Sequence, residues 1–147
     1  MITLTEEQIS QIEKHGEREY PYECCGLLLG QFAMNDEKKT VTEIFPIENA
    51  REEAAKYNRS LITPQDLMRG EQYAREKKLD VVGNYHSHPD HPARPSQFDL
   101  DHALPVWSYV IVSVEKEKAV DVRSWEMEND RSKFNEEEIE KNGTPSS

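Results

Sequence analysis

Two segments of the chain carry the apolar spacing of amphipathic helices. In residues 5–20, Ile9 and Ile12 lie three positions apart among polar residues, with a threonine before them as a cap and a proline just after. Residues 63–79 open with threonine and proline and then spread leucine and tyrosine side chains along their length. We therefore expect a second helix there despite Gly70.

Five apolar or alternating runs predict strands. CGLLLGQF is bounded by glycine and TVTEIFPI alternates as a half-buried strand does, so we expect the two to pair through the polar turn between them. DVVGNYHSH is typical of a strand that leaves the core and ends at histidines, and two further runs are separated by a charged turn. The predicted strands cover residues 25–32, 40–47, 80–88, 108–115 and 119–125.

The order of these elements predicts a single α/β domain, in which a mixed sheet packs against flanking helices. A chain of 147 residues is long enough to bury one core. After Trp125 the sequence becomes polar and rich in charge. We therefore expect a domain at residues 1–127, followed by a polar acidic tail at 128–147 whose last residues are disordered.

The amino-acid composition limits the classes of binding partner and the cellular compartment that we expect. Asp and Glu outnumber Lys and Arg by 29 to 18, and the net charge of -11 repels nucleic acid and anionic membranes. The longest apolar stretch, WSYVIVSV, is far shorter than the roughly 20 residues of a membrane span, and the first residues lack the pattern of a secretory signal. The two cysteines are adjacent and cannot link distant segments. We expect a cytoplasmic protein with no nucleic-acid or membrane partner.

The stretch NYHSHPDHPARPSQFD, residues 84–99, concentrates three of the five histidines. In a strand, side chains two positions apart share a face, so His86 and His88 present their rings side by side and form half of a metal site. The prolines stiffen the loop that follows, and Ser96 is placed to cap a short helix. Asp99, on the first turn of that helix, is a candidate third ligand.

Other interpretations of these residues stay open. Ser-x-x-Asp also resembles a helix capping box, which needs no metal, and His-x-His is common on exposed strands. Two histidines and one carboxylate hold Fe(II) in oxygenases as well as Zn²⁺ in hydrolases. When two histidines and one carboxylate bind a tetrahedral zinc ion, the fourth position is left for a water molecule, as hydrolysis requires.

With a glutamate upstream, this spacing resembles the JAMM (MPN+) metalloprotease family. That family has a glutamate, then His-Ser/Thr-His, seven residues, a serine, two residues and an aspartate. Here Glu23, HSH at 86–88, Ser96 and Asp99 meet the pattern, and YECCGLLLG is similar to the family's segment around the glutamate. The likeness covers most of the chain and is greatest to small bacterial stand-alone members. It implies the JAMM/MPN fold, a cytidine-deaminase-like sandwich.

The resemblance implies a role for each motif residue. His86, His88 and Asp99 are expected to bind Zn²⁺ with a catalytic water, whose pKa the metal lowers to near 7. Glu23 is expected to act as a general base that passes the water's proton to the leaving amine. Ser96 is expected to donate a hydrogen bond to the oxyanion of the tetrahedral intermediate.

The same resemblance implies a zinc metallopeptidase that cleaves the amide bond after the C-terminal Gly-Gly of a ubiquitin-like or sulfur-carrier protein, with release of cysteine as one option. Two other functions stay open, a non-catalytic MPN-type binding module and a 2-His-1-carboxylate Fe(II) enzyme. A zinc deaminase is disfavoured because no Pro-Cys-x-x-Cys occurs. The sequence leaves the carrier, the leaving group and the oligomeric state open, a homodimer included.

Three residues near the motif are not expected to be ligands. His91 in the proline-rich loop and His102 on the following helix are interpreted as surface histidines or as hydrogen-bond partners behind the ligands. Cys25 is interpreted as a small buried side chain. Whether any of the three assists the site stays open.

Overall fold

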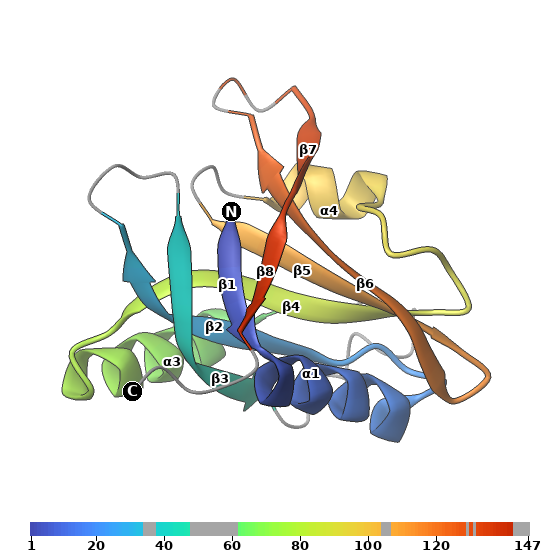
Figure 1. Ribbon diagram of the computed structural model, residues 1–147, viewed down its shortest axis with the longest axis horizontal. Coiled ribbons are helices and arrows are strands. Elements are labelled where there is room, and N and C mark those ends of the chain that lie inside the picture. Colours follow the sequence, from blue (N-terminus) through green and yellow to red (C-terminus); the bar gives the residue numbers. More distant parts are fainter. Residues whose placement is uncertain (34–37, 48–61, 104–106, 129, 131, 143–147) are drawn as a thin grey trace.

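In the part of the chain that the computed structural model describes, one mixed sheet has eight strands in the order β7-β6-β5-β4-β2-β3-β1-β8, with helices on both faces (Figure 1). The pairs β1/β3, β1/β8 and β4/β5 are parallel, and the other neighbours are antiparallel. The structure describes residues 1–33, 38–47, 62–103, 107–128, 130 and 132–142. The elements are β1 (Ile2–Thr5), α1 (Glu6–Glu19), β2 (Cys25–Phe32), β3 (Lys39–Ile47), α3 (Pro64–Glu76), β4 (Asp80–Pro89), α4 (Gln97–His102), β5 (Ser108–Glu115), β6 (Lys118–Met127), β7 (Phe134–Glu137) and β8 (Ile139–Asn142).

The α/β class and the mixed sheet predicted from the element order are confirmed. All five predicted strands form, as β2 to β6, and β2 pairs with β3 in an antiparallel hairpin. The turn between these two strands includes residues 34–37, which lie outside the described part of the chain.

Both predicted helices also form, and α1 has its predicted cap. Thr5 closes a capping box with Gln8 at the start of α1, and Thr63 caps α3. A Cβ at Gly70 would lie only 2.1 Å from Leu27 Cδ1, so the glycine lets α3 lie close against β2. Among the described residues, no helix has the length and apolar character needed to cross a bilayer.

The two faces of the sheet bury separate apolar clusters. On one face, Ile9 and Ile12 of α1 pack with Val110 and other valines of the central strands. On the other face, α3 packs against Leu27 of β2, and α4 packs against Tyr109 of β5. Leu27 and Tyr109 are both register partners of one β4 residue, so α3 and α4 share this face.

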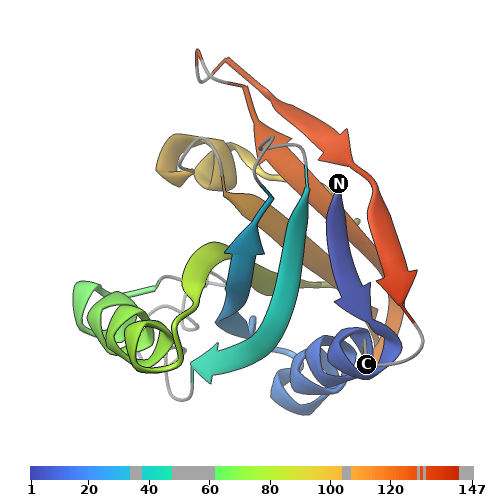
Figure 2. The same ribbon diagram turned by 60° about the vertical axis from the view of Figure 1, so that its left-hand side comes forward.

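The sheet curls until strands from its two halves meet (Figure 2). Lys39 of β3 reaches across, with Nζ 2.5 Å from Glu126 Oε2 and 3.4 Å from Glu137 Oε2. Glu137 Oε1 also accepts hydrogen bonds from the hydroxyls of Ser108 and Ser124, at 2.6 and 2.8 Å. Lys39 is 3% and Glu137 is 5% exposed, so a buried ion pair with satisfied oxygens joins the two halves.

The expected tail at 128–147 is wrong for the part of it that the structure describes. Residues 134–142 form two strands, of which β7 pairs with β6 and β8 pairs with β1. Phe134 packs in the cluster beneath α4, and Ile139 packs against the α1 cluster. The segment's high charge suggested a solvated tail, but its key carboxylate, on Glu137, is buried and paired.

The Glu137 cluster makes a prediction about stability. Glu137→Ala leaves the hydroxyls of Ser108 and Ser124 buried without their acceptor and leaves Lys39 with only Glu126, so we expect it to lower the free energy of unfolding by about 3–5 kcal/mol. Glu136→Ala is the matched control, since that side chain is 49% exposed in a surface ion pair, and we expect about 0.5 kcal/mol or less. Urea unfolding measures both, and equal stabilities of the two variants would contradict the docking of β7 described above.

Candidate metal centre

The two histidines of the HSH motif lie side by side at the end of β4. His86 and His88 point to the same face, with their Nε2 atoms 3.2 Å apart and their ring centroids 4.9 Å apart. They are 7% and 8% exposed, because β4 lies between β2 and β5 in the middle of the sheet. Ser87 points to the opposite face, where its Oγ accepts the N–H of Cys24 at 2.8 Å. The predicted alternation of this strand is confirmed.

The short helix α4 brings the carboxylate of Asp99 to the two rings. Ser96 caps this helix: its Oγ accepts the Asp99 N–H at 3.1 Å, and its own N–H donates to Asp99 Oδ2 at 2.7 Å. Asp99 Oδ1 lies 3.2 Å from His86 Nε2, and Oδ2 lies 3.4 Å from His88 Nε2. The capping box and the approach to the histidines therefore coexist in one side chain.

The three side chains fit a tetrahedral metal ion. Their ligand atoms all lie within 4.8 Å of one another. Zinc bonds nitrogen and oxygen at about 2.0–2.1 Å, so two ligands of a tetrahedral zinc are about 3.3–3.4 Å apart. The Nε2 atoms of His86 and His88 are 3.2 Å apart, close to that separation, and each ring faces a different oxygen of Asp99, Oδ1 at 3.2 Å from His86 and Oδ2 at 3.4 Å from His88. The fourth corner is the open position that catalytic zinc sites keep.

A backbone carbonyl fixes the orientation of His88. Its Nδ1 lies 2.9 Å from the carbonyl oxygen of Pro92. Because a carbonyl only accepts, Nδ1 carries a hydrogen, and Nε2, on the side of Asp99, is the nitrogen that would bind a metal ion in place of its proton. Burial alone would lower the pKa of His88, but the hydrogen bonds to Asp99 and Pro92 and the charge of Glu23 raise it.

The carboxylate of Asp99 stays ionised although it is largely buried. Burial alone would raise its pKa. The charge of His86 and hydrogen bonds from His86, His88 and the Ser96 N–H outweigh burial and hold the pKa well below its usual range. A negative ligand is therefore in place beside two imidazoles.

Glu23 lies just before β2, where that strand runs beside the histidines. Cys25 pairs with His86 in the sheet, and continuing this antiparallel register brings Glu23 level with His88 on the same face. The charge of Glu23 contributes to the raised pKa of His88. The upstream glutamate therefore lies at the end of β2 that runs beside the histidines.

The three residues not expected to be ligands have different surroundings. His91 has an exposed side chain, as expected for a surface histidine. Cys25 is 2% exposed in the apolar cluster beneath α3, and burial raises the pKa of its thiol far above the ordinary value. The side chain of His102 lies outside the described part of the structure.

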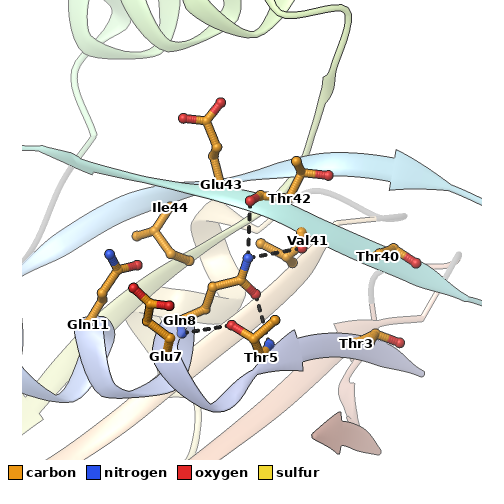
Figure 3. Close-up of a pocket in the computed structure, with 10 residues that line it drawn as sticks. All are labelled: Thr3, Thr5, Glu7, Gln8, Gln11, Thr40, Val41, Thr42, Glu43 and Ile44. Carbon is orange, nitrogen blue, oxygen red and sulfur yellow. Dashed lines mark hydrogen bonds between the residues drawn. The ribbon is translucent and has the colours of Figure 1, made fainter. Parts of the chain in front are cut away.

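A cavity of about 460 Å³ lies away from these residues, between α1, β1 and β3 (Figure 3). Gln8 crosses its base, and its side-chain amide donates to the carbonyls of Val41 and Thr42, each at 3.1 Å. Threonine hydroxyls and two glutamates line the rest of the wall. Among the described residues that line this cavity there is no histidine or cysteine, so we do not place the candidate metal centre there.

Two contacts at the metal centre were missed from the sequence. Ser87 holds the N–H of the residue that follows Glu23, and Pro92 orients His88. The first has a weak signal, because the alternation of HSH already points the serine away from the metal. The second has none, since every residue has a carbonyl and only the path of the loop brings this one to the ring.

Comparison with known proteins gives relatives of two kinds. The chain is 30% identical over 110 residues to a tail tip assembly protein K of Escherichia phage N15, and 33% identical over 95 residues to a desampylase of Haloferax volcanii. These matches span 73% and 63% of this chain but only 40% and 63% of the two relatives.

Solved structures share the fold over nearly the whole chain. A protein from Desulfitobacterium hafniense, 31% identical, superposes with a TM-score of 0.82 over 98% of this chain and 94% of its own. A JAB1/MPN domain protein from Archaeoglobus fulgidus, 19% identical, gives 0.55 over 95% and 96%. The second match shows that the fold is that of JAB/MPN domains, as the motif predicted.

A family model described as prokaryotic homologues of the JAB domain matches residues 5–128. This range contains every motif residue from the upstream glutamate to the aspartate of α4. The predicted resemblance to small stand-alone JAMM proteins is confirmed: the chain belongs to the prokaryotic JAB-domain family.

Proposed function

We propose that this protein is a zinc-dependent hydrolase of the JAMM type, which cleaves the amide bond after the C-terminal Gly-Gly of a ubiquitin-like or sulfur-carrier protein. The observation that carries the proposal is the convergence of His86, His88 and Asp99, which each offer one ligand atom within 4.8 Å of the others, as a zinc ion bound by two imidazoles and a carboxylate requires. The relative from Haloferax volcanii supports the same reaction class, because a desampylase acts on a ubiquitin-like modifier.

The residues around these three ligands divide the work of hydrolysis. Zinc held here supplies a Lewis acid and lowers the pKa of a water molecule to near 7. Glu23 takes a proton as the water oxygen bonds to the amide carbon, and returns it to the nitrogen as the C–N bond breaks. The Ser96 hydroxyl donates to the developing oxyanion; its oxygen accepts the Asp99 N–H, and its own proton is available to donate.

A Gly-Gly tail suits the recessed position of the ligands. The histidines are 7% and 8% exposed, so a substrate must bring its backbone close to the sheet surface to reach them. Glycine has no Cβ and allows that approach. We place the reaction in the cytoplasm, because Cys24 and Cys25 are both free thiols. Cysteine released from a sulfur carrier is the leaving group to test first.

Metal binding is the first test. His88→Ala removes one of the three ligands, so we expect the variant to lose its stoichiometric zinc and its hydrolysis together. His91→Ala is the control, since this exposed histidine lies three residues farther along, and it should keep both. Zinc content after dialysis, measured by mass spectrometry, gives the readout. Iron with oxygen consumption in place of zinc would favour the Fe(II) alternative.

Cleavage itself is tested by incubating the zinc-loaded protein with carrier fusions that end in Gly-Gly-Cys or Gly-Gly-peptide. The masses of the products are then measured by mass spectrometry. We expect a mass loss at the bond after Gly-Gly, abolished by a chelator and restored by Zn²⁺. Glu23→Gln should keep the metal but lose about 10²–10⁴-fold in rate, because the proton carrier is gone. Glu71→Gln, an exposed glutamate on α3, should be unchanged. Zinc binding without any cleavage would support the non-catalytic alternative.

Substitutions at Ser96 distinguish its role as a helix cap from its proposed role in catalysis. Glycine is almost as good an N-cap as serine, at a cost of a few tenths of a kcal/mol, but has no hydroxyl. We therefore expect Ser96→Gly to keep the metal while kcat falls about 100- to 1000-fold, and Ser96→Thr to recover most of the rate. Unchanged kcat in Ser96→Gly would mean that the serine only caps α4.

A further inference from the structure

The loop between His88 and α4 is held along four successive residues. Asp90, at φ 57°, accepts the Lys116 N–H at 3.1 Å and the Tyr20 hydroxyl at 2.6 Å. The next three residues are each held through the carbonyl oxygen by a side chain from the sheet. We call residues 90–93 the strap.

The three strap carbonyls are held from three different strands. Ser113 Oγ of β5 donates to the carbonyl of His91 at 2.6 Å. Trp125 Nε1 of β6 donates to the carbonyl of Ala93 at 3.0 Å. The carbonyl between them, that of Pro92, is the one that receives Nδ1–H of His88. The group that orients a metal ligand is therefore fixed on both sides by side chains that do not touch the metal centre.

The strap also controls the third ligand. Ala93 is 1% exposed, and only two residues separate it from Ser96, the cap that holds the Asp99 carboxylate at 2.7 Å. A shift of the strap would move both the acceptor of His88 and the start of α4. Metal sites need their ligands within about 0.5 Å of the working geometry, so such a shift weakens binding.

We propose that Trp125 and Ser113 are positioning residues of the metal centre, which act through the strap carbonyls on His88 and Asp99. This inference rests on the proposed function insofar as the centre binds a metal. It adds two residues from β5 and β6, strands that contribute no residue to the motif. Both side chains donate to backbone carbonyls, which every residue has. The two contacts therefore depend on Trp125 and Ser113 and not on which residues make up the strap.

Trp125→Phe tests the indole N–H while it keeps an aromatic ring in place. Trp107→Phe is the matched control, because Trp107 is also half-buried, packs in the same cluster beneath α4 and contacts the ring of Tyr109. Partners behind metal-ligating histidines change metal affinity about 10- to 100-fold. We expect Trp125→Phe and Ser113→Ala each to weaken zinc binding about tenfold, and Trp107→Phe to stay within about twofold of the wild type.

Zinc affinity is measured by competition with a coloured chelator, the visible spectrum of the Co²⁺ form reports ligand geometry, and urea unfolding of the metal-free protein reports stability. A changed Co²⁺ spectrum in Trp125→Phe but not in Trp107→Phe supports positioning. If the two variants lose affinity equally, in step with stability, the tryptophan is only structural and the inference fails. Wild-type affinity in both Trp125→Phe and Ser113→Ala also overturns it.

A measurement on the metal-free protein separates this inference from the proposed function. The Nδ1–H of His88 is observed by NMR with ¹⁵N-labelled histidine. We expect Trp125→Phe to shift or broaden this signal, and Trp107→Phe to leave it in place. If the wild type binds no zinc, the proposed function fails, yet this signal still decides whether the strap is held as described. An unmoved signal in Trp125→Phe overturns the inference whatever the metal result.

Discussion

The Asp99 carboxylate is the interaction on which the whole metal centre depends. One oxygen accepts the N–H of Ser96, and this bond both starts α4 and fixes the direction of the side chain. The same carboxylate faces His86 at 3.2 Å and His88 at 3.4 Å. A helix cap is a local structure that a sequence can specify over four residues. Here that local structure aims a ligand at a pair of histidines from another element, so capping and metal binding are one arrangement.

The sheet positions the two histidines of the metal centre, because both lie on β4, a strand in the middle of the sheet. β4 has neighbours on both sides, and its alternation sends His86 and His88 toward α4 while Ser87 holds the backbone beside Glu23 from the opposite face. Ligands on a central strand cannot move without breaking pairing on both sides. The loop that leaves this strand is tied back to β5 and β6, so the motif residues rest on four neighbouring strands.

Sequence reasoning succeeded where the controlling interactions are local. The cap at Thr5, the alternation of β4 and the capping of α4 by Ser96 all act within a few residues, and each forms as predicted. The family resemblance then supplied Glu23, which spacing alone does not distinguish from other glutamates. The role that each motif residue plays in hydrolysis stays a prediction until it is measured.

Contacts that depend on the curl of the sheet could not be predicted from local patterns along the chain. Strands β1, β7 and β8 are four residues long, too short for a clear apolar period, and β7 and β8 are mostly polar. β7 is held by Glu137, which meets Lys39 from a strand almost 100 positions earlier in the chain. The same limit hid the bond from Trp125 to the Ala93 carbonyl. Long-range partners of this kind have no local pattern, although they fix the positions of locally predicted groups.

These interactions together make the centre a preformed one. Small zinc domains take their folding energy from the metal, since their ligands converge only when it binds. In this protein the ligands converge through a helix cap, a central strand and a loop held by β5 and β6, above apolar clusters that the metal does not touch. For the proposed metal centre this arrangement means that folding does not wait for the metal. The free energy of binding would then not be consumed in bringing the ligands together.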